Sequence, residues 1–223
     1  MFSMYEKLMA LPIFKGASTN IIQTFAEKTP LMFSKYSEGQ TIVTPKESCN
    51  TVKCLLSGSV VISHPVAGRS IWIHETVGPD SMIGIERLFG LDTTFSIKAV
   101  AAEECSVMEF SKKIFIQLLQ DHQLLMINYI NYLCRNAQKP ATALLDNPLD
   151  SPASFLAMLV SLTTSRESKN VEIEFKEGID SSFVYNDGKI SETISSLVKK
   201  GVIRIASNRL IKIISREDLC SCL

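Results

Sequence analysis

The hydrophobic pattern changes from a strand period to a helical period near Lys112, and this change constrains the fold more than any other feature. Before it, residues 33–107 contain short β-type runs broken by Gly, Pro, Asn and Asp. Short and regularly spaced runs of this kind are typical of a barrel or a sandwich. From Lys112 to about Gln138 the apolar residues follow a helical period, and Lys139-Pro140 is predicted to stop that helix. The pattern therefore predicts an α+β protein with a long helix after its β domain.

Two short helices are predicted before the β domain. Residues 1–11 form the first and residues 18–26 the second, which Ser18 or Thr19 opens as an N-cap. The strands are expected at residues 41–43, 52–56, 59–63, 70–75 and 96–101.

The long predicted helix has two apolar stripes, so it needs two partners. One is expected to be its own β domain and the other the same helix of a second subunit, as in a two-fold dimer. The alternative is a core helix within one monomer. One stripe contains Met126, Ile130, Leu133 and Ala137, and the second contains Leu124, Ile127 and Cys134. Of these, Met126, Ile130, Leu133 and Ala137 are the predicted dimer interface.

The C-terminal third has the order of a winged helix-turn-helix, which is helix, turn, helix and hairpin. A Pro- and Asp-rich break at residues 146–152 is predicted to be a hinge, and Ser151-Pro152 to cap the next helix. After that helix we expect a strand at residues 171–175, helices at 179–185 and 189–200, and a two-stranded wing with its turn at 206–209.

The whole chain has no formal net charge, but its basic residues are concentrated near the C-terminal end. The formal net charge is zero, with 23 basic and 23 acidic residues. Between residues 189 and 216, however, seven positive residues face one acid, Glu192, and such a local excess favours contact with a polyanion. The positive residues are Lys189, Lys199, Lys200, Arg204, Arg209, Lys212 and Arg216.

Several classes of function are not indicated by the sequence. The six cysteines have neither Cys-x-x-Cys nor zinc spacing, so we expect plain thiols and no metal site. No nucleophile and base pairing, phosphate-binding loop or dinucleotide-binding pattern is present, so we expect no catalytic residues and no enzyme. The first eleven residues do not resemble a signal peptide and no apolar run spans a membrane, so we expect a cytoplasmic protein without membrane contact.

Residues 11–214 resemble the Crp/Fnr superfamily of bacterial transcription regulators. The resemblance is carried by LPIFKG at residues 11–16, LLSGSV at 55–60, GPDSMIG at 78–84 and CSVMEFS at 105–111, in this order. It implies a double-stranded β-helix (jelly-roll) barrel of the cyclic-nucleotide-binding type, a long dimerisation helix and a C-terminal winged helix-turn-helix. The implied ranges are 1–111 for the barrel domain, 112–139 for the helix, 140–150 for the hinge and 151–223 for the DNA-binding domain.

The resemblance also indicates where an effector would bind. Members that bind cyclic AMP supply a glutamate for the ribose and an Arg-Ser pair for the phosphate, because guanidinium meets phosphate bidentately. Here the glutamate position is Ile85, the arginine position is Phe95, and only the serine remains, as Ser96. Burying a phosphate without its guanidinium is unfavourable, so we expect that cyclic AMP is not the effector. The predicted effector pocket consists of Gly84, Ile85, Glu86, Phe95, Ser96 and Tyr129.

Other effectors remain open at this point. A shifted register could rebuild a partial site from Glu86 and Lys98. An iron-sulfur cluster is excluded because no cysteine precedes Cys49, and haem would have only His64 or His74 as an axial ligand. An aromatic or acidic metabolite would suit Ile85, Phe95, Tyr129 and Tyr132. Alternatively, Phe95 simply fills a pocket that binds nothing.

The predicted DNA-reading helix departs from the pattern of the superfamily. Its relatives begin this helix with a Ser-Arg-Glu-Thr type of run that reads base edges, whereas residues 186–191 are NDGKIS. Asp187 at the arginine position would repel phosphate. The remaining candidates for groove and phosphate contacts are Lys176, Asn186, Lys189, Ser191, Glu192, Ser195, Lys199 and Arg209.

The sequence thus predicts a homodimeric DNA-binding transcription regulator without a cofactor. Its DNA affinity is expected to be coupled to a small molecule other than cyclic AMP, through a shift between dimer arrangements. The expected partners are double-stranded DNA, a second copy of the chain and RNA polymerase. The alternative is an effector- or protein-binding module with a degenerate DNA-reading helix.

Overall fold

The structure is a computed structural model that describes residues 4–66, 69–145, 151–164, 168, 170–179 and 189–221. It divides into two compact units. Unit 1 contains residues 1–61 and 77–136, and unit 2 contains residues 62–76 and 137–223. The chain therefore passes between the units three times, at residues 61–62, 76–77 and 136–137.

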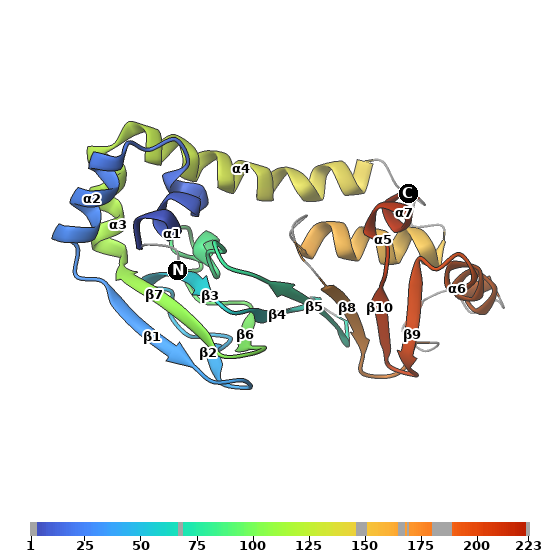
Figure 1. The fold of residues 1–223 in the computed structure, drawn as a ribbon. Coiled ribbons are helices and arrows are strands. Elements are labelled where there is room, and N and C mark those ends of the chain that lie inside the picture. The colour runs from blue at the N-terminus through green and yellow to red at the C-terminus, as the bar shows by residue number, and fades with distance from the viewer. Residues whose placement is uncertain are drawn as a thin grey trace. The chain divides into compact units, whose positions relative to one another are not determined.

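Unit 1 begins with helices that pack beside a three-stranded antiparallel sheet (Figure 1). Ser18 opens the second helix, and its side chain accepts a hydrogen bond from the Ile21 backbone N–H, which confirms the predicted cap. The helices are α1 (Met4–Ala10), the short 3-10 helix η1 (Pro12–Phe14) and α2 (Thr19–Lys28). The sheet has the order β1 (Met32–Tyr36), β7 (Cys105–Ser111) and β3 (Thr51–Ser57).

A second strand pair and an aromatic core complete the β part of unit 1. Strand β2 (Thr41–Val43) pairs antiparallel with β6 (Lys98–Ala101). The rings of Phe14, Phe25, Phe110 and Phe115 form a chain of contacts, with centroids 5.1 to 6.1 Å apart. Offset and edge-on aromatic pairs of this kind stabilise a core beyond the area that they bury. The predicted strands at 41–43, 52–56 and 96–101 are thus found to within two residues.

The predicted long helix is in fact two helices, which corrects the sequence prediction. Helix α3 (Lys112–Asp121) ends at His122, whose backbone is extended, and α4 (Gln123–Leu145) follows. The His122 carbonyl accepts from the Leu125 N–H at 3.0 Å, so the residue that ends one helix begins the next. Helix α4 also continues past Pro140, which was predicted to stop it. A proline inside a helix removes one hydrogen bond, and this helix tolerates that loss.

Unit 2 joins a hairpin from the first half of the sequence to the C-terminal segment. Strands β4 (Val60–Pro65, of which residues 62–65 are in unit 2) and β5 (Ile71–Val77) form this hairpin, and Figure 1 shows β5 beside β8 (Asn170–Phe175). Strand β8 pairs on its other side with β10 (Leu210–Ile213), which pairs with β9 (Ile203–Ser207), all antiparallel. The helices are α5 (Pro152–Thr163), α6 (Lys189–Lys199) and α7 (Arg216–Cys220).

Several predictions for the C-terminal third are confirmed. Ser151 caps α5 through the Ser154 N–H, with Pro152 in the first turn, and α6 lies at the predicted residues. The β9–β10 hairpin is also found, but β9 extends to Ser207, two residues into the predicted turn. The predicted helix from residue 180 to 185 and the hinge core at 146–150 lie outside the described residues. Within the described ranges, no helix is long and apolar enough to cross a membrane.

Candidate functional site

The segment between β5 and β6 carries five of the six predicted effector residues, and its turn at Gly84 has a left-handed backbone. Gly84 has a φ of +65° and stands before the short 3-10 helix η2 (Ile85–Arg87). Residues with a side chain rarely adopt this left-handed conformation, so glycine is favoured here. The Gly84 carbonyl accepts a weak hydrogen bond from the Cys49 thiol at 3.7 Å.

The two side chains at the predicted positions of the cyclic-AMP anchors, Ile85 and Phe95, are apolar and buried. Phe95 is 2% exposed and Ile85 is 1% exposed. The Phe95 backbone pairs with a neighbouring turn: its N–H donates to the Glu47 carbonyl at 2.9 Å, and its carbonyl accepts from the Lys46 N–H at 2.8 Å. Both side chains are therefore part of the core of unit 1.

Arg87, which the sequence did not single out, lies beside Ser96 of the predicted effector pocket. Arg87 Nη2 donates to Ser96 Oγ at 3.0 Å, and Arg87 Nη1 lies 3.7 Å from a carboxylate oxygen of Asp92. Asp92 also accepts from the backbone and the hydroxyl of Thr94, and these hydrogen bonds, together with Arg87, lower the pKa of its carboxyl. The only sequence signal for this pairing was the position of Arg87 one turn after the Gly84 bend.

Glu86 and Lys98, the residues of a possible shifted site, are both exposed. The guanidinium near Ser96 instead comes from Arg87, and it already has a carboxylate partner. An anion at this surface would have to compete with Asp92 for the same cation.

Tyr129 connects the loop to helix α4. Its hydroxyl donates to the Ile85 carbonyl at 3.3 Å, and its ring lies 5.0 Å from Phe115 and 6.0 Å from Phe89. Burial raises the pKa of Tyr129 to about 12, with smaller contributions from Glu86 and Cys49. Of the predicted effector residues, Gly84, Ile85, Phe95 and Tyr129 are thus buried close to one another, whereas Glu86 and Ser96 are exposed.

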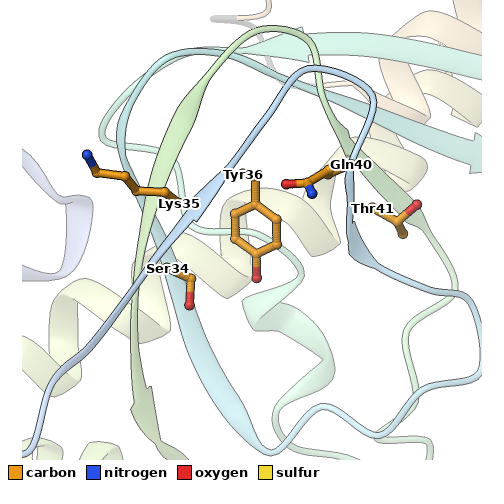
Figure 2. A pocket seen from close by; sticks show the side chains of 5 residues that line it. All are labelled: Ser34, Lys35, Tyr36, Gln40 and Thr41. Carbon is orange, nitrogen blue, oxygen red and sulfur yellow. The ribbon is translucent and has the colours of Figure 1, made fainter.

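A groove of about 520 Å³ lies elsewhere on unit 1 (Figure 2). Ser34, Lys35 and Tyr36 come from β1, and Gln40 and Thr41 come from the turn and the start of β2. Figure 2 shows the Tyr36 ring between the Ser34 side and the Gln40 side, with Lys35 directed away. None of the predicted effector residues lines this groove.

The described part of α6 has one polar face and one buried face. Ile194 is 5% exposed and Leu197 is 3% exposed, and both belong to the core of unit 2. The opposite face carries exposed polar residues that were predicted to contact DNA. These are Ser191, Glu192, Ser195 and Lys199.

The remaining predicted DNA contacts are Lys176, Asn186, Lys189 and Arg209. Arg209 is exposed in the turn between β9 and β10. Lys176 is exposed, but its ammonium group lies 4.8 Å from the centre of the Trp72 ring, within the range of a cation–π contact. Asn186 and the side chain of Lys189 lie outside the described part of the chain.

A wide apolar surface of α4 is exposed, whereas a different face packs within unit 1. Leu125 is fully buried and Tyr129 is 5% exposed. No residue of either predicted stripe is buried, which corrects the expectation that one stripe would pack against the β domain. The exposed residues of α4 include Leu124, Met126, Ile127, Ile130, Cys134 and Ala137, and Leu133 is half-buried.

No metal site is evident in the described ranges, because no group of three or more His, Cys, Asp or Glu side chains could hold an ion. Three cysteines, Cys49, Cys54 and Cys105, are buried. Burial raises the pKa of Cys54 to about 12 and, with Glu86, that of Cys49 to about 11. These thiols are therefore poor nucleophiles and poor metal ligands at neutral pH.

Comparison with known proteins identifies the type of domain that residues 33–122 form. Residues 33–122 match the family described as the cyclic nucleotide-binding domain, so the chain contains a domain of this type within an α+β fold. The match covers well under half of the chain. No curated protein matches it.

Solved structures of low identity resemble the chain. The catabolite activator protein of Thermus thermophilus is 16% identical, with 95% of this chain and 99% of that chain covered and a TM-score of 0.49. The sensor domain of the regulator DNR from Pseudomonas aeruginosa is 17% identical, with 59% and 91% covered and a TM-score of 0.48. A transcriptional regulator from Thermotoga maritima is 16% identical, with 55% and 94% covered and a TM-score of 0.47.

Proposed function

We propose that the chain is a homodimeric, DNA-binding transcription regulator of the Crp/Fnr type. The observation that carries the proposal is the order of helices and strands that follow the cyclic nucleotide-binding domain. Helix α6 has buried Ile194 and Leu197 on one side and exposed polar residues on the other, and the β9–β10 hairpin follows it. A polar helix face backed by a core, with a hairpin beside it, is the arrangement that a winged helix-turn-helix presents to a major groove.

Charge supports the same proposal. Lys199, Lys200, Arg204 and Arg209 are all exposed on α6, on β9 or in the adjoining turns. Phosphate contacts supply most of the affinity of a DNA-binding domain, and they need exposed cations on one element or on neighbouring ones. Lys212 is less available, because it lies 2.7 Å from Glu172.

The effector, in this proposal, is a small molecule other than cyclic AMP. Phe95 and Ile85 occupy the positions of the phosphate and ribose anchors, and both are buried. RNA polymerase is a proposed further partner, as it is for transcription regulators in general.

The first experiment is a selection of random duplex DNA with purified protein, followed by fluorescence anisotropy across a salt series. We expect an enriched, roughly two-fold symmetric site and a steep salt slope. Lys199→Gln should weaken binding and lower the salt slope by about one. The matched control is Lys35→Gln, an exposed lysine on β1, which should leave both unchanged. No enrichment with or without cell extract would reject DNA binding and favour a protein-binding module with a degenerate reading helix.

A further inference from the structure

We propose that a groove between helices α5 and α6 of unit 2 binds a small aliphatic zwitterion, with an ammonium group at one end and a carboxylate at the other. The groove has a volume of about 320 Å³, at the small end of the range for small-molecule sites. None of the predicted effector residues lines it. Its described lining residues are Ala153, Glu192, Thr193, Ser196, Leu197 and Lys200.

The floor of the groove is apolar and its rim is polar. Leu197 is 3% exposed and Ala153 is 8% exposed, and both belong to the core of unit 2. Thr193 is half-buried and Ser196 is exposed, so two hydroxyl groups stand above this floor. Small-molecule sites commonly combine an apolar floor with a few polar groups that orient the ligand. The groove therefore favours a ligand with a short hydrocarbon middle.

Glu192 and Lys200 place opposite charges at the two ends of the groove. Together with Ser196 they follow a four-residue spacing, so the three residues share one stripe of α6 and its C-terminal end. Eight residues of helix rise by about 12 Å, which is too far for the usual ion pair within a helix. In the described part of the chain, the ion pairs include neither Glu192 nor Lys200.

The turn that follows α6 fixes the backbone at Lys200. Gly201 has a φ of +72°, and its N–H donates to the Val198 carbonyl at 3.0 Å. The Val202 N–H donates to the Leu197 carbonyl at 2.9 Å, which completes a Schellman motif. Leu197 and Val202 are both buried in the core of unit 2. The Lys200 side chain therefore extends from a rigid point at the end of the groove.

A zwitterion matches both ends of this groove. Its ammonium group would pair with the Glu192 carboxylate and its carboxylate with the Lys200 ammonium, whereas a molecule with one charge leaves the other end unmatched. The distance between the two side chains favours a ligand whose charges are separated by a chain, and disfavours an α-amino acid, whose charges adjoin one carbon. An ω-amino acid and a dipeptide share this chemistry.

A bound zwitterion would act on α6, and this consequence alone rests on the proposed function. Lys200 is one of the cations that we propose for phosphate contacts, and the carboxylate of the ligand would neutralise it. Ser191, Ser195 and Lys199 are exposed and do not line the groove, so they stay available to DNA. The ligand should therefore weaken DNA binding without abolishing it, by about fivefold.

The test is an NMR titration of the isotopically labelled full chain, without DNA, with 6-aminohexanoate and with glycyl-leucine. We expect shifts at residues 192–200 and a Kd on the order of 1 mM, because solvent screens both exposed charges. Hexanoate and hexylamine, which each carry one of the two charges, should bind about fivefold more weakly. Tighter binding of glycyl-leucine would identify a peptide ligand, and tighter binding of 6-aminohexanoate an ω-amino acid.

Two variants and a matched control complete the test. Glu192→Gln and Lys200→Gln should each weaken the binding of 6-aminohexanoate by about fivefold. Lys199→Gln removes a neighbouring exposed lysine that does not line the groove, so it should leave the Kd unchanged. All three side chains are exposed, and the variants should fold as the parent does.

The possible results separate this proposal from the proposed function. Equal binding of hexanoate, hexylamine and 6-aminohexanoate would overturn it, and so would an unchanged Kd in both groove variants. A lack of shifts at residues 192–200 with either zwitterion would overturn it as well. If the parent binds no DNA, the proposed function fails, while the titration still decides whether the groove binds a zwitterion.

Discussion

The ring of Phe95 occupies the space that a Cβ atom on Gly84 would need. Such a Cβ would lie 2.6 Å from Cε1 and 2.7 Å from Cδ1 of Phe95, closer than side-chain carbons approach one another. Two features therefore favour glycine at position 84: its positive φ and the Phe95 ring packed against it. Phe95, at the predicted phosphate position, is therefore buried and packed against Gly84.

Gly84→Ala should destabilise unit 1 more than Gly39→Ala. Both residues have a positive φ, +65° for Gly84 and +80° for Gly39. Backbone strain should therefore lower the free energy of unfolding of both variants by about 1 kcal/mol. Only Gly84 has a ring within 3 Å of the new Cβ, and overpacking adds about 1 to 3 kcal/mol. Chemical denaturation measures the difference, and equal losses would show that Phe95 moves aside freely.

Cyclic AMP should not raise the unfolding temperature of the parent protein. A ligand present at 100 times its Kd would stabilise the folded state by about 2.7 kcal/mol, a shift of several degrees. Ile85→Glu with Phe95→Arg restores the two missing anchors and should gain such a response, whereas Ile85→Glu with Phe95→Lys should gain less, because lysine lacks the bidentate fork. A shift in the parent would contradict our assignment of Phe95 as a closed position.

The sequence pattern predicted much of the fold, because its signals are local. Periods of two and 3.6 residues located most strands and helices, and Ser18 and Ser151 were recognisable caps. The boundary at His122 was not recognisable, since the helical period continues across it. The pairing of β5 with β8 joins residues about 100 positions apart, and no local pattern specifies such a partner.

The candidate site was predictable only in part, for a similar reason. Alignment with a family pattern located Gly84, Ile85 and Phe95, but it could not locate Arg87, which reaches Ser96 because a 3-10 turn redirects its side chain. The helical period of α4 did not show that the Tyr129 hydroxyl reaches the Ile85 carbonyl either. Contacts of this kind depend on rotamers and on distant packing.

Alkaline pH should weaken the folded state, and Tyr129 should contribute to this. Burial raises the pKa of Tyr129 from 10.0 to about 12, so the folded state holds this proton more tightly than the unfolded state. The resulting stability is fully present below pH 10 and is lost as pH rises toward 12. Denaturation at a series of pH values measures this dependence, and Tyr129→Phe should make it less steep. A slope unchanged by the substitution would assign the effect to other groups, such as Cys54, whose pKa burial raises to about 12.

Ile73→Ala should unfold the C-terminal strands first, although residue 73 lies far from them in the sequence. Ile73 is fully buried in the core of unit 2. Its truncation to alanine should lower the free energy of unfolding by about 2 to 5 kcal/mol. Ile97, 4% exposed, belongs to unit 1 and provides the matched control. Hydrogen exchange should increase in β8 and β10 for Ile73→Ala and in β7 for Ile97→Ala. The reverse pattern would show that the hairpin belongs with unit 1.

Ile130→Glu should convert the proposed dimer into a monomer without unfolding it. Ile130 is 48% exposed on α4, within an apolar surface that also contains Met126, 38% exposed, and Ile127, 47% exposed. Water-exposed apolar side chains in such a group favour burial against a second copy, and a charge at the centre of the resulting interface would have no partner. Asn131→Glu, at an exposed polar position next to it, is the control for charge alone. Sedimentation velocity should show a monomer for Ile130→Glu and a dimer for the parent and for Asn131→Glu, with similar unfolding temperatures at low protein concentration. A parent protein that sediments as a monomer would leave this face of α4 without its proposed partner, and two-fold symmetric DNA sites would then no longer be expected.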